Sequence, residues 1–586
     1  MIAWKQDKEA VRSLLTGRFQ RTIALQMPPL LATVSGVLST KTSLVRYTDR
    51  ELPAIALITT KSFQVVPNPG NREPVICEME PGSYGNSVGL KNPGMEVALA
   101  ELQQLRQTYG LRALLNVSVS ASCAEDFITL VRAFQEVADI IELNFSCPHA
   151  SVGFGASIGC SPDISADYIS SIRQACPECK ALIFAKLTPN VPDIGEIALA
   201  VVKAGVDGIT AINTVGPEVH VEPHSGKSIL QNKVGGKGGK SGNWIRTQAL
   251  SSVRRIREVV GDRIPIIGMG GVSSGADVAA MVQAGADAVG VGSAFGKVHQ
   301  KQWRPYTDAL LADSSAILQG REPSADSATY CQKTRAMVYE PHRIVHMLRH
   351  SEDIVVVTLD GNLSYEAGQF VFLWIPGVGE KPFSVAEANP LAFVIKRRGP
   401  FTEALFALKT GDSLYVRGLY GAPIEPERTN RAVLLAGGTG VAVLPALAER
   451  LSAQGTKMDI LVGTSSEGAT ADGKALLEDT LSRYGHFLSV PDAGVPGRIL
   501  QSLDDYLTDC ADVACYLVGP EKFMAAAARK IRAAGVPDQR ILLSMELKTL
   551  CGIGMCGECA CGDRLTCQWG TFMSYDYLSR EAPELL

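Results

Sequence analysis

The sequence lacks several features that would place it in whole classes of proteins. Its 586 residues carry a net charge of only −4, which gives no reason to expect nucleic acid or an anionic membrane as partner. The N-terminus MIAWKQDKEAVRSLL has charged residues where a signal peptide has its apolar stretch. The longest apolar run, residues 432–448, is too short for a bilayer and is broken by glycine and proline. We therefore expect a cytoplasmic, soluble protein without nucleic-acid or membrane partners.

The first half of the chain alternates short β-branched runs with longer amphipathic segments, and no internal repeat stands out. Repeated strand–helix units predict a parallel sheet. About eight units within roughly 290 residues favour a closed (β/α)8 (TIM) barrel over an open doubly wound sheet. The clearest predicted strands are 113–120, 138–146, 181–189, 205–213, 264–271 and 287–294.

The second half has a different pattern of apolar and polar residues. Short alternating runs separated by Gly, Pro and Asn suggest a small antiparallel barrel, after which strand–helix alternation returns. The overall prediction is an α/β chain: a TIM barrel, a ferredoxin-reductase-like module and a small iron–sulfur domain. The expected parts are 1–312 (barrel), 313–336 (a polar linker with little periodicity), 337–430 (antiparallel β-barrel), 431–543 (α/β nucleotide-binding domain) and 544–586 (cysteine-rich domain).

Five of the fourteen cysteines lie close together near the C-terminus. In a cytoplasmic chain such a group predicts a metal site rather than disulfides. The spacing Cys551-x4-Cys556-x2-Cys559, followed by Cys567, matches plant-type ligation of a [2Fe–2S] cluster. Zinc is the alternative, although it usually takes paired Cys-x2-Cys knuckles and only one is present. Cys561 could replace Cys559 or Cys567; we treat it as a non-ligand.

Two glycine-rich turns in the second half suit nucleotides. LLAGGTGVA (434–442) follows an apolar strand and opens a helix, where a pyrophosphate can bind, and YLVGPEKFM (516–524) is a second strand ending in Gly-Pro. The preceding region offers KPFS (381–384) and RRGPFTEAL (397–405), in which Thr402 could cap a helix. Either glycine turn alone could be a simple tight turn.

This combination resembles the ferredoxin–NADP reductase family and, across 337–586, the iron–sulfur electron-transfer subunit of NAD-dependent dihydroorotate dehydrogenases. The resemblance implies FAD and NAD as cofactors, with NADP left open. It assigns FAD to Lys381, Pro382, Phe383, Ser384 and Thr402, and the NAD side to Gly437, Gly438, Thr439 and Gly440. Lys381 departs from the usual Arg, which loses the planar fork but keeps the charge.

The barrel half has the features of a flavin enzyme. Gly270-Gly271 and Gly292-Ser293 end two consecutive strands, as expected for a phosphate cradle after barrel strands seven and eight. Asparagines and lysines also lie at strand ends, where donors and positive charge favour a reduced flavin, although a lysine there could simply reach solvent. These residues are Asn116, Asn144, Asn213, Lys61 and Lys186.

A cysteine follows one of these asparagines, in the segment NFSCPH. A free cysteine is commonly buried and inert, but Cys147 has a setting that favours a catalytic thiol. The motifs TTKS (59–62), GNSVGLKNPG (85–94), NFSCPH (144–149), KLTPNV (186–191), INT (212–214), GGKSG (238–242) and GMGG (268–271) occur in the order found in class 1 dihydroorotate dehydrogenases, a resemblance spanning about 30–300.

That resemblance implies FMN as cofactor, a pyrimidine substrate and a homodimer formed through the barrel. It makes Cys147 the base that removes a C5 proton while hydride leaves C6 for the flavin. It assigns the substrate to Lys61, Asn86, Ser87, Val88, Gly89, Leu90, Asn144, His149, Asn213 and Thr214, with the amides of 88–90 forming an anion-binding nest. It assigns FMN to Ser35, Gly36, Lys61, Asn116, Lys186, Gly242, Gly270, Gly271, Gly292 and Ser293.

His149 is the departure from that pattern, because dihydroorotate enzymes generally have a second asparagine there. A histidine after SCP resembles dihydropyrimidine dehydrogenases, which reduce uracil and thymine, although His149 could also be a loop residue packed beside the site. The leading hypothesis is oxidation of dihydroorotate at FMN, with electrons passing through [2Fe–2S] and FAD to NAD⁺ for pyrimidine biosynthesis. The alternatives are NADH-dependent reduction of another pyrimidine such as uracil or thymine, and a non-catalytic electron-transfer flavoprotein.

Overall fold

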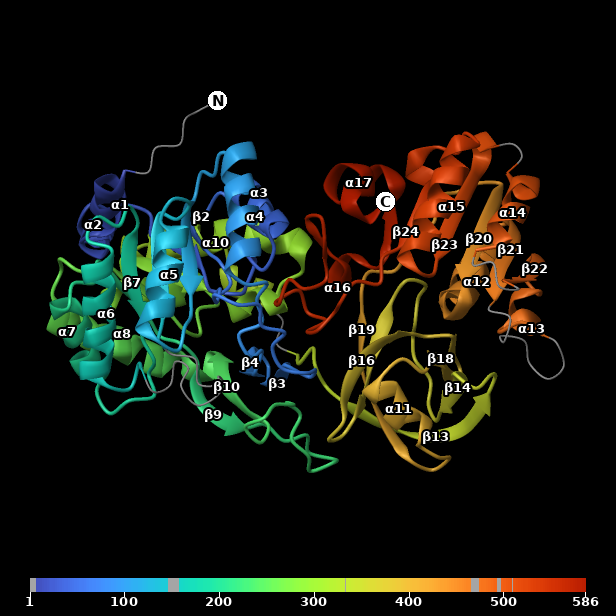
Figure 1. The fold of residues 1–586 in the computed structure, drawn as a ribbon, viewed down its shortest axis with the longest axis horizontal. Helices are drawn as coiled ribbons and strands as arrows, with labels where there is room; N and C mark the ends of the chain where they lie inside the picture. Colours follow the sequence, from blue (N-terminus) through green and yellow to red (C-terminus); the bar gives the residue numbers. More distant parts are fainter. Residues whose placement is uncertain (1–6, 146–157, 332–333, 465–473, 493–496, 508–509) are drawn as a thin grey trace. The chain divides into compact units, whose positions relative to one another are not determined.

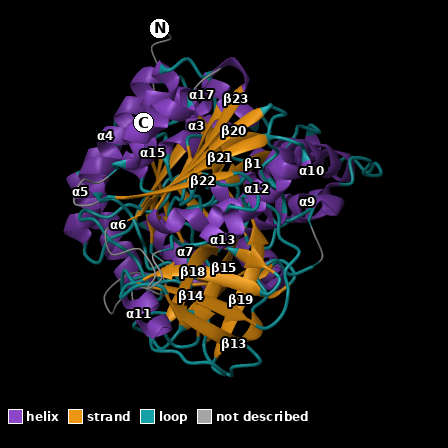
Figure 2. Ribbon diagram, turned by 90° about the vertical axis from the view of Figure 1, so that its right-hand side faces the viewer, coloured by secondary structure: helices purple, strands orange, loops and turns teal. Residues whose placement is uncertain are grey.

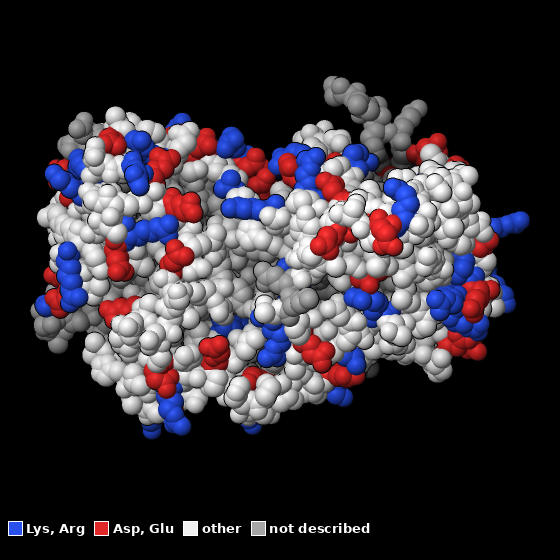
Figure 3. All heavy atoms as spheres, turned by 180° about the vertical axis from the view of Figure 1, so that it is seen from behind, with Lys and Arg blue, Asp and Glu red and all other residues white. Residues whose placement is uncertain are grey.

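The computed structural model describes residues 7–145, 158–331, 334–464, 474–492, 497–507 and 510–586. These residues form two units, each described by itself below (Figure 1). The first unit comprises residues 1–336 together with 553–558, and the second comprises 337–552 together with 559–586. Among the described helices, none is both long and apolar enough to cross a membrane. On the face drawn in Figure 3, acidic and basic side chains are interspersed, in keeping with the small net charge.

The first unit is built on a closed barrel of parallel strands, in the order β1-β12-β11-β8-β7-β6-β5-β2. The predicted TIM-barrel fold is therefore confirmed. The barrel strands are β1 Leu30–Thr33, β2 Ile55–Thr59, β5 Leu114–Val119, β6 Ile140–Asn144, β7 Leu182–Lys186, β8 Gly208–Ala211, β11 Ile266–Met269 and β12 Ala288–Val291.

Helices surround the barrel, and Figure 1 shows α5 to α8 on its outer side. The helices of this unit are α1 Lys8–Leu15, α2 Arg18–Ala24, α3 Thr42–Glu51, α4 Met95–Thr108, α5 Ala124–Phe134, α6 Pro162–Ala175, α7 Ile194–Lys203, α8 Arg246–Val260, α9 Gly275–Gln283 and α10 Trp303–Leu318. Some of these helices begin with a side-chain cap: the Ser161 and Asp193 side chains accept amide hydrogens of α6 and α7.

The barrel interior is apolar at one end. Ile140, Leu182 and Phe184 point inward there, and Val11 and Leu15 of α1 belong to the same buried cluster. Side chains alternate along a strand, so residues two and four positions further along share the inward face. Along β6 this places Ile140, Glu142 and Asn144 on the inside in succession. The interior thus changes from apolar to polar toward the carboxyl ends of the strands.

A small antiparallel sheet is inserted between barrel elements, in the order β3-β4-β10-β9. Its strands are β3 Ile76–Glu80, β4 Ser83–Asn86, β9 Val215–Val219 and β10 Lys237–Gly242. The last helix of this unit, α10, ends at Leu318, which lies inside the segment 313–336 predicted as a linker. The polar residues that suggested a linker are accommodated by the fold, because the buried Asp313 carboxylate accepts the amides of Ala325 (2.8 Å) and Ser327 (2.7 Å).

The second unit begins with an antiparallel sheet in the order β16-β15-β19-β13-β14-β18-β17, which packs around its own apolar core. Figure 2 shows its strands together with those of the second, parallel sheet of this unit. The elements of the first sheet are β13 Glu340–Arg349, β14 Ile354–Leu359, β15 Phe370–Ile375, β16 Gly379–Ser384, β17 Glu387–Ala388, β18 Leu391–Lys396, α11 Pro400–Phe406 and β19 Ser413–Tyr420.

The rest of the second unit is a six-stranded, mostly parallel sheet in the order β22-β21-β20-β23-β24-β27. Its last strand comes from the segment predicted as a separate cysteine-rich domain and pairs antiparallel with β24. The elements are β20 Arg431–Gly437, α12 Leu444–Ala453, β21 Lys457–Thr464, α13 Glu478–Leu481, β22 His486–Pro491, α14 Ile499–Ser502, β23 Val513–Val518, α15 Glu521–Ala533, β24 Ile541–Ser544, β25 Ala560–Cys561, β26 Arg564–Leu565, α16 Thr566–Trp569, β27 Phe572–Ser574 and α17 Tyr575–Glu581.

Candidate functional site

The carboxyl ends of the barrel strands carry a connected set of polar side chains. Asn144 lies at the end of β6 and Asn213 follows β8; the Asn213 Nδ2 donates to the Asn144 Oδ1 at 3.3 Å. The Asn144 Nδ2 in turn donates to the Ser62 Oγ at 3.1 Å, and the Ser62 and Ser35 hydroxyls lie 3.3 Å apart. The structure therefore brings together four residues that lie far apart in the sequence. Three of them, Asn144, Asn213 and Ser35, are among the residues predicted to hold substrate or flavin.

Asn116 lies deeper in the same barrel and is fully buried. Its Nδ2 donates to the Thr59 Oγ1 at 3.2 Å, while its Oδ1 has no hydrogen-bond partner among the described residues. A buried acceptor of this kind is costly unless a ligand or water supplies a donor. A planar heterocycle with N–H groups, such as a flavin, fits this requirement.

Glu142 is a member of the site that the sequence analysis missed. Its buried carboxylate accepts from the Ser118 Oγ at 3.0 Å and the Asn116 Nδ2 at 3.5 Å, and it pairs with the Lys186 Nζ at 3.4 Å. Lys186 does not extend to solvent, since only 6% of its side chain is exposed. The signal in the sequence was a carboxylate in the middle of the apolar strand DIIELNF, because a charge at a buried position needs a partner.

The glycines predicted to hold a phosphate lie at the ends of β10, β11 and β12. Gly242 and Gly271 have φ values of 93° and 72°, and a Cβ on Gly271 would lie 2.9 Å from the Gly242 carbonyl oxygen. The two backbones pack directly against each other, which no other residue type permits. Since β11 and β12 are the last two barrel strands, these turns occupy the place where such barrels bind phosphate groups.

Lys61 follows β2 at the same end of the barrel. Its Nζ lies 3.7 Å from the Glu558 Oε1, and Lys91 forms an ion pair with the other oxygen of that carboxylate. Burial lowers the pKa of Lys61, an effect that the Glu558 carboxylate opposes. Glu558 is a second residue that the sequence analysis missed, because the contact joins positions almost 500 residues apart in the chain.

The segment that contains the predicted carboxylate nest, residues 88–90, follows β4 as a tightly held turn. The Asn86 Nδ2 donates to the Gly239 carbonyl at 3.1 Å, and the buried Ser87 hydroxyl accepts from the Asn71 Nδ2 at 3.0 Å. Leu90 has a φ of 55°, which is uncommon for a residue with a side chain. Thr214 continues from the asparagine pair, its amide donating to the Asn213 Oδ1 at 2.8 Å. Cys147 and His149 lie outside the described residues.

The FAD segment predicted from sequence lies in the second unit, on β16. Lys381, Pro382, Phe383 and Ser384 are all partly exposed, and the Phe383 ring lies 6.0 Å from that of Phe401 on α11. Thr402 caps α11 from its third position: its Oγ1 accepts the amides of Arg398 at 2.8 Å and Gly399 at 3.1 Å.

The GGTG turn joins β20 to the 3-10 helix Gly438–Val443, which leads into α12. A Cβ on Gly440 would lie 3.0 Å from the Val518 carbonyl oxygen, so this turn touches the end of β23. The two glycine-rich segments singled out in the sequence are therefore neighbours at the carboxyl ends of adjacent parallel strands, where open α/β sheets bind ligands.

The cysteines of the C-terminal cluster are all buried. The Cys567 thiol interacts with those of Cys551 and Cys559, and its hydrogen bond lowers the pKa of Cys559. Cys556 lies in the segment 553–558, which groups with the first unit, and its carbonyl accepts from the Thr40 hydroxyl at 2.7 Å. Cys561 instead packs in an apolar cluster with residues such as Met573 and Leu578.

No group of three or more His, Cys, Asp or Glu side chains is arranged around a single ion position within the described ranges. That arrangement is typical of zinc, whereas each iron of a [2Fe–2S] cluster takes only two cysteines. Three buried thiols, of which Cys567 contacts both Cys551 and Cys559, are of the donor type that an iron–sulfur cluster takes.

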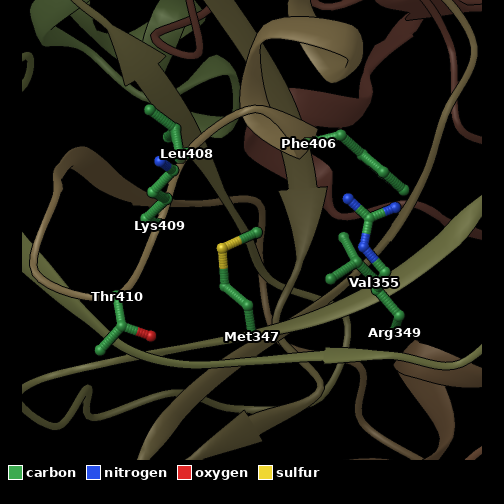
Figure 4. A pocket seen from close by; sticks show the side chains of 7 residues that line it. All are labelled: Met347, Arg349, Val355, Phe406, Leu408, Lys409 and Thr410. Atoms are coloured by element: carbon green, nitrogen blue, oxygen red, sulfur yellow. The ribbon is translucent and has the colours of Figure 1, made fainter.

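A pocket of about 130 Å³ opens on the antiparallel sheet of the second unit (Figure 4). Its lining combines apolar and basic side chains: Met347, Arg349, Val355, Phe406, Leu408, Lys409 and Thr410. None of them belongs to a predicted site.

The parallel barrel with its polar mouth and glycine cradle defines the first unit as a TIM-barrel enzyme. The dihydroorotate dehydrogenase family profile matches residues 22–308. The catalytic subunit of dihydroorotate dehydrogenase B (NAD(+)) of Methanocaldococcus jannaschii is 42% identical over 237 residues, 40% of this chain and 74% of that protein. The fumarate-type dihydroorotate dehydrogenase A of Lacticaseibacillus paracasei is 35% identical over 46% of this chain and 88% of its own.

A solved structure of an NADH-dependent reduced ferredoxin–NADP oxidoreductase is 25% identical over 42% of this chain and 93% of its own. Its TM-score of 0.36 is too low to support an inference about this chain. The sequence similarity to the curated relatives is decisive: the chain belongs to the dihydroorotate dehydrogenase family and is an oxidoreductase. Family membership sets aside the hypothesis of a non-catalytic scaffold.

Proposed function

We propose that this chain oxidises dihydroorotate to orotate and reduces NAD⁺ to NADH. The observation that carries the proposal is the connected array Ser62–Asn144–Asn213 at the barrel mouth, beside the buried Lys186 and the glycine cradle. Asparagine amides offer both donors and acceptors, which suits the alternating N–H and C=O edge of a pyrimidine ring. Relatives named as NAD(+)-type catalytic subunits support the choice of substrate and acceptor.

In this proposal the chain's own residues bind, orient and deprotonate the substrate. Asn86, Asn144, Asn213 and Thr214 hold the ring, and the backbone amides of residues 88–90 receive its carboxylate. Cys147, as thiolate, takes the C5 proton while the C6 hydride leaves, so the products are orotate, NADH and one proton. A thiol base with an ordinary pKa near 8.5 favours turnover at mildly alkaline pH.

Three resident cofactors and one exchangeable nucleotide, NAD, are part of the proposal. FMN would be held by Ser35, Gly36, Lys61, Asn116, Lys186, Gly242, Gly270, Gly271, Gly292 and Ser293. FAD would be held by Lys381–Ser384 and Thr402, NAD by residues 437–440, and a [2Fe–2S] cluster by Cys551, Cys556, Cys559 and Cys567. When bound, FMN accepts hydride, and the cluster and FAD carry the electrons to NAD⁺.

The second unit supports a NAD⁺ acceptor in preference to fumarate. A fumarate-type relative is similar to the barrel as well, so the barrel alone does not choose between the acceptors. The adjacent glycine turns on β20 and β23, together with the buried cysteines, supply what a nucleotide acceptor and an electron relay need. We further propose five domains, 1–312, 313–336, 337–430, 431–543 and 544–586, and a homodimer formed through the barrel.

The second candidate is reduction of uracil or thymine with NADH, favoured by the histidine at position 149. An anaerobic comparison of NAD⁺ plus dihydroorotate with NADH plus uracil, followed at 340 nm, separates the two. We expect turnover with dihydroorotate at alkaline pH and none with uracil. The reverse pattern would overturn the leading proposal in favour of the second.

A further inference from the structure

A buried ion pair in the second unit lies against the backbone of the first cluster cysteine. The Arg417 side chain on β19 and the Glu380 side chain on β16 are both fully buried. The Arg417 Nε and Nη2 donate to the two Glu380 oxygens at 2.8 and 2.7 Å, a bidentate arrangement. The guanidinium also lies 3.8 Å from the centre of the Phe372 ring.

The remaining N–H groups of this guanidinium are directed to the cysteine segment and to one tyrosine. Nη1 donates to the Cys551 carbonyl at 3.0 Å and the Tyr420 hydroxyl at 2.8 Å, and Nη2 donates to the Leu550 carbonyl at 3.2 Å. All five donors of Arg417 therefore have acceptors. Two of those acceptors are the consecutive backbone carbonyls at the start of the proposed cluster site.

Neighbouring tyrosines hold the Glu380–Arg417 ion pair in place. The Tyr339 hydroxyl donates to the Glu380 Oε2 at 2.7 Å, so Glu380 is held from a second side. The Tyr420 ring packs on the same cysteine segment, since a Cβ on Gly552 would lie 2.9 Å from it. Glu380 directly precedes Lys381, the first residue of the proposed FAD segment. One rigid network thus connects the proposed FAD strand to the cluster backbone.

We propose that Arg417, oriented by Glu380, is a positioning residue for the iron–sulfur cluster; this rests on the proposed function. It holds the Leu550–Cys551 backbone so that Cys551 is aligned as a ligand before the cluster is bound. Its positive charge, closer to the cluster backbone than the carboxylate is, also favours the reduced, more negative cluster. Hydrogen bonds and nearby charges are what set the potentials of such clusters.

The alternative is that the pair only stabilises the fold. A buried ion pair replaced by apolar residues of similar size is often neutral for stability, whereas removing one partner leaves an unpaired buried charge. We therefore expect the double variant Glu380→Leu/Arg417→Met to fold while it removes the contacts to Leu550 and Cys551. Arg417→Lys keeps the charge but loses the fork that reaches two carbonyls at once. Arg431→Lys is the matched control, since Arg431 pairs with Asp459 elsewhere in the same unit.

The test uses the full-length holoenzyme purified without oxygen. Folding is followed by FAD content and the thermal unfolding midpoint. The cluster is followed by iron and sulfide content, the electron paramagnetic resonance signal, the redox midpoint and the rate of bleaching by a chelator. We expect both Arg417 variants to retain FAD but to lose the cluster to the chelator at least about tenfold faster than the wild type. A hydrogen bond from a charged donor typically contributes a free energy that corresponds to a tenfold change or more. The double variant also has a lower redox midpoint, and Arg431→Lys matches the wild type.

Three results would contradict these expectations. Wild-type bleaching rate and midpoint in the double variant would overturn the inference and leave the proposed function intact. Loss of FAD together with the cluster in both Arg417 variants would make the pair a general support of the fold and overturn the inference as well. A wild-type enzyme that contains both flavins but no iron would overturn the proposed function itself.

Discussion

Glu142 provides the strongest test of the barrel site, because its partners are all buried. Replacing it with leucine removes the counter-charge of Lys186, whose side chain is 6% exposed, and the acceptor of the Ser118 hydroxyl. An unpaired buried charge typically costs about 3–5 kcal/mol. We therefore expect Glu142→Leu to lower the free energy of unfolding by about that amount, measured by denaturant titration of the full chain.

A double-mutant cycle separates the pair from its surroundings. Glu142→Leu/Lys186→Met should be more stable than Glu142→Leu alone, with a coupling energy of about 2 kcal/mol or more. The control is Asp139→Asn, which breaks the similarly buried pair with Arg106 at the opposite end of β6. FMN retention during gel filtration should fall in Glu142→Leu and not in Asp139→Asn. If Glu142→Leu lowers the free energy of unfolding by less than about 1 kcal/mol, and the cycle shows no coupling to Lys186, the reasoning is refuted.

The remaining predictions concern the base, acid stability, the cluster and the nucleotide turn. Cys147→Ser should keep FMN, by absorbance, yet lose turnover about a hundredfold to ten-thousandfold; retained turnover would exclude the thiol as base. Burial raises the pKa of Asp207, but Arg173 and the Ile183 amide outweigh it and the net pKa is lowered. The contribution of Asp207 to the free energy of unfolding is therefore present above the pKa of about 3.9 in the unfolded chain, and it is lost as pH falls through the folded pKa. Asp207→Asn should flatten the acid side of the profile of stability against pH. Iron analysis should find the cluster lost in Cys567→Ser and kept in Cys561→Ser; the opposite result would exchange their roles. Gly440→Ala, whose new Cβ would meet the Val518 carbonyl, should raise the KM for NADH in a dye-reduction assay, and an unchanged KM would remove this turn from the site.

The sequence was sufficient for the barrel because its signals are local. Apolar runs such as 181–189 match β7 closely, and the glycines after β11 and β12 mark the turns after the last two barrel strands. Asn144 and Asn213, two of the asparagines noted at strand ends, lie within hydrogen-bond distance of each other, since parallel strands of a barrel bring their carboxyl ends to one mouth.

What the sequence did not provide are pairings between distant positions. Glu142 was overlooked inside an apolar strand, although its partner Lys186 had been singled out. Glu380 and Arg417 have no local signature, because they come together only when β15 pairs with β16 on one side and with β19 on the other. The helix α10 continues to Leu318, inside the segment 313–336 that the polar composition suggested as a linker, and the buried Asp313 there accepts backbone amides from further along the chain.

The most direct test of the central claim is the stoichiometry of product formation by the purified enzyme without oxygen. Dihydroorotate and NAD⁺ are mixed at mildly alkaline pH, and orotate and NADH are measured separately by their absorbance. The account predicts equal amounts of orotate and NADH, with neither formed by Cys147→Ser. Orotate without NADH, or no orotate at all while NADH reduces uracil, would contradict it.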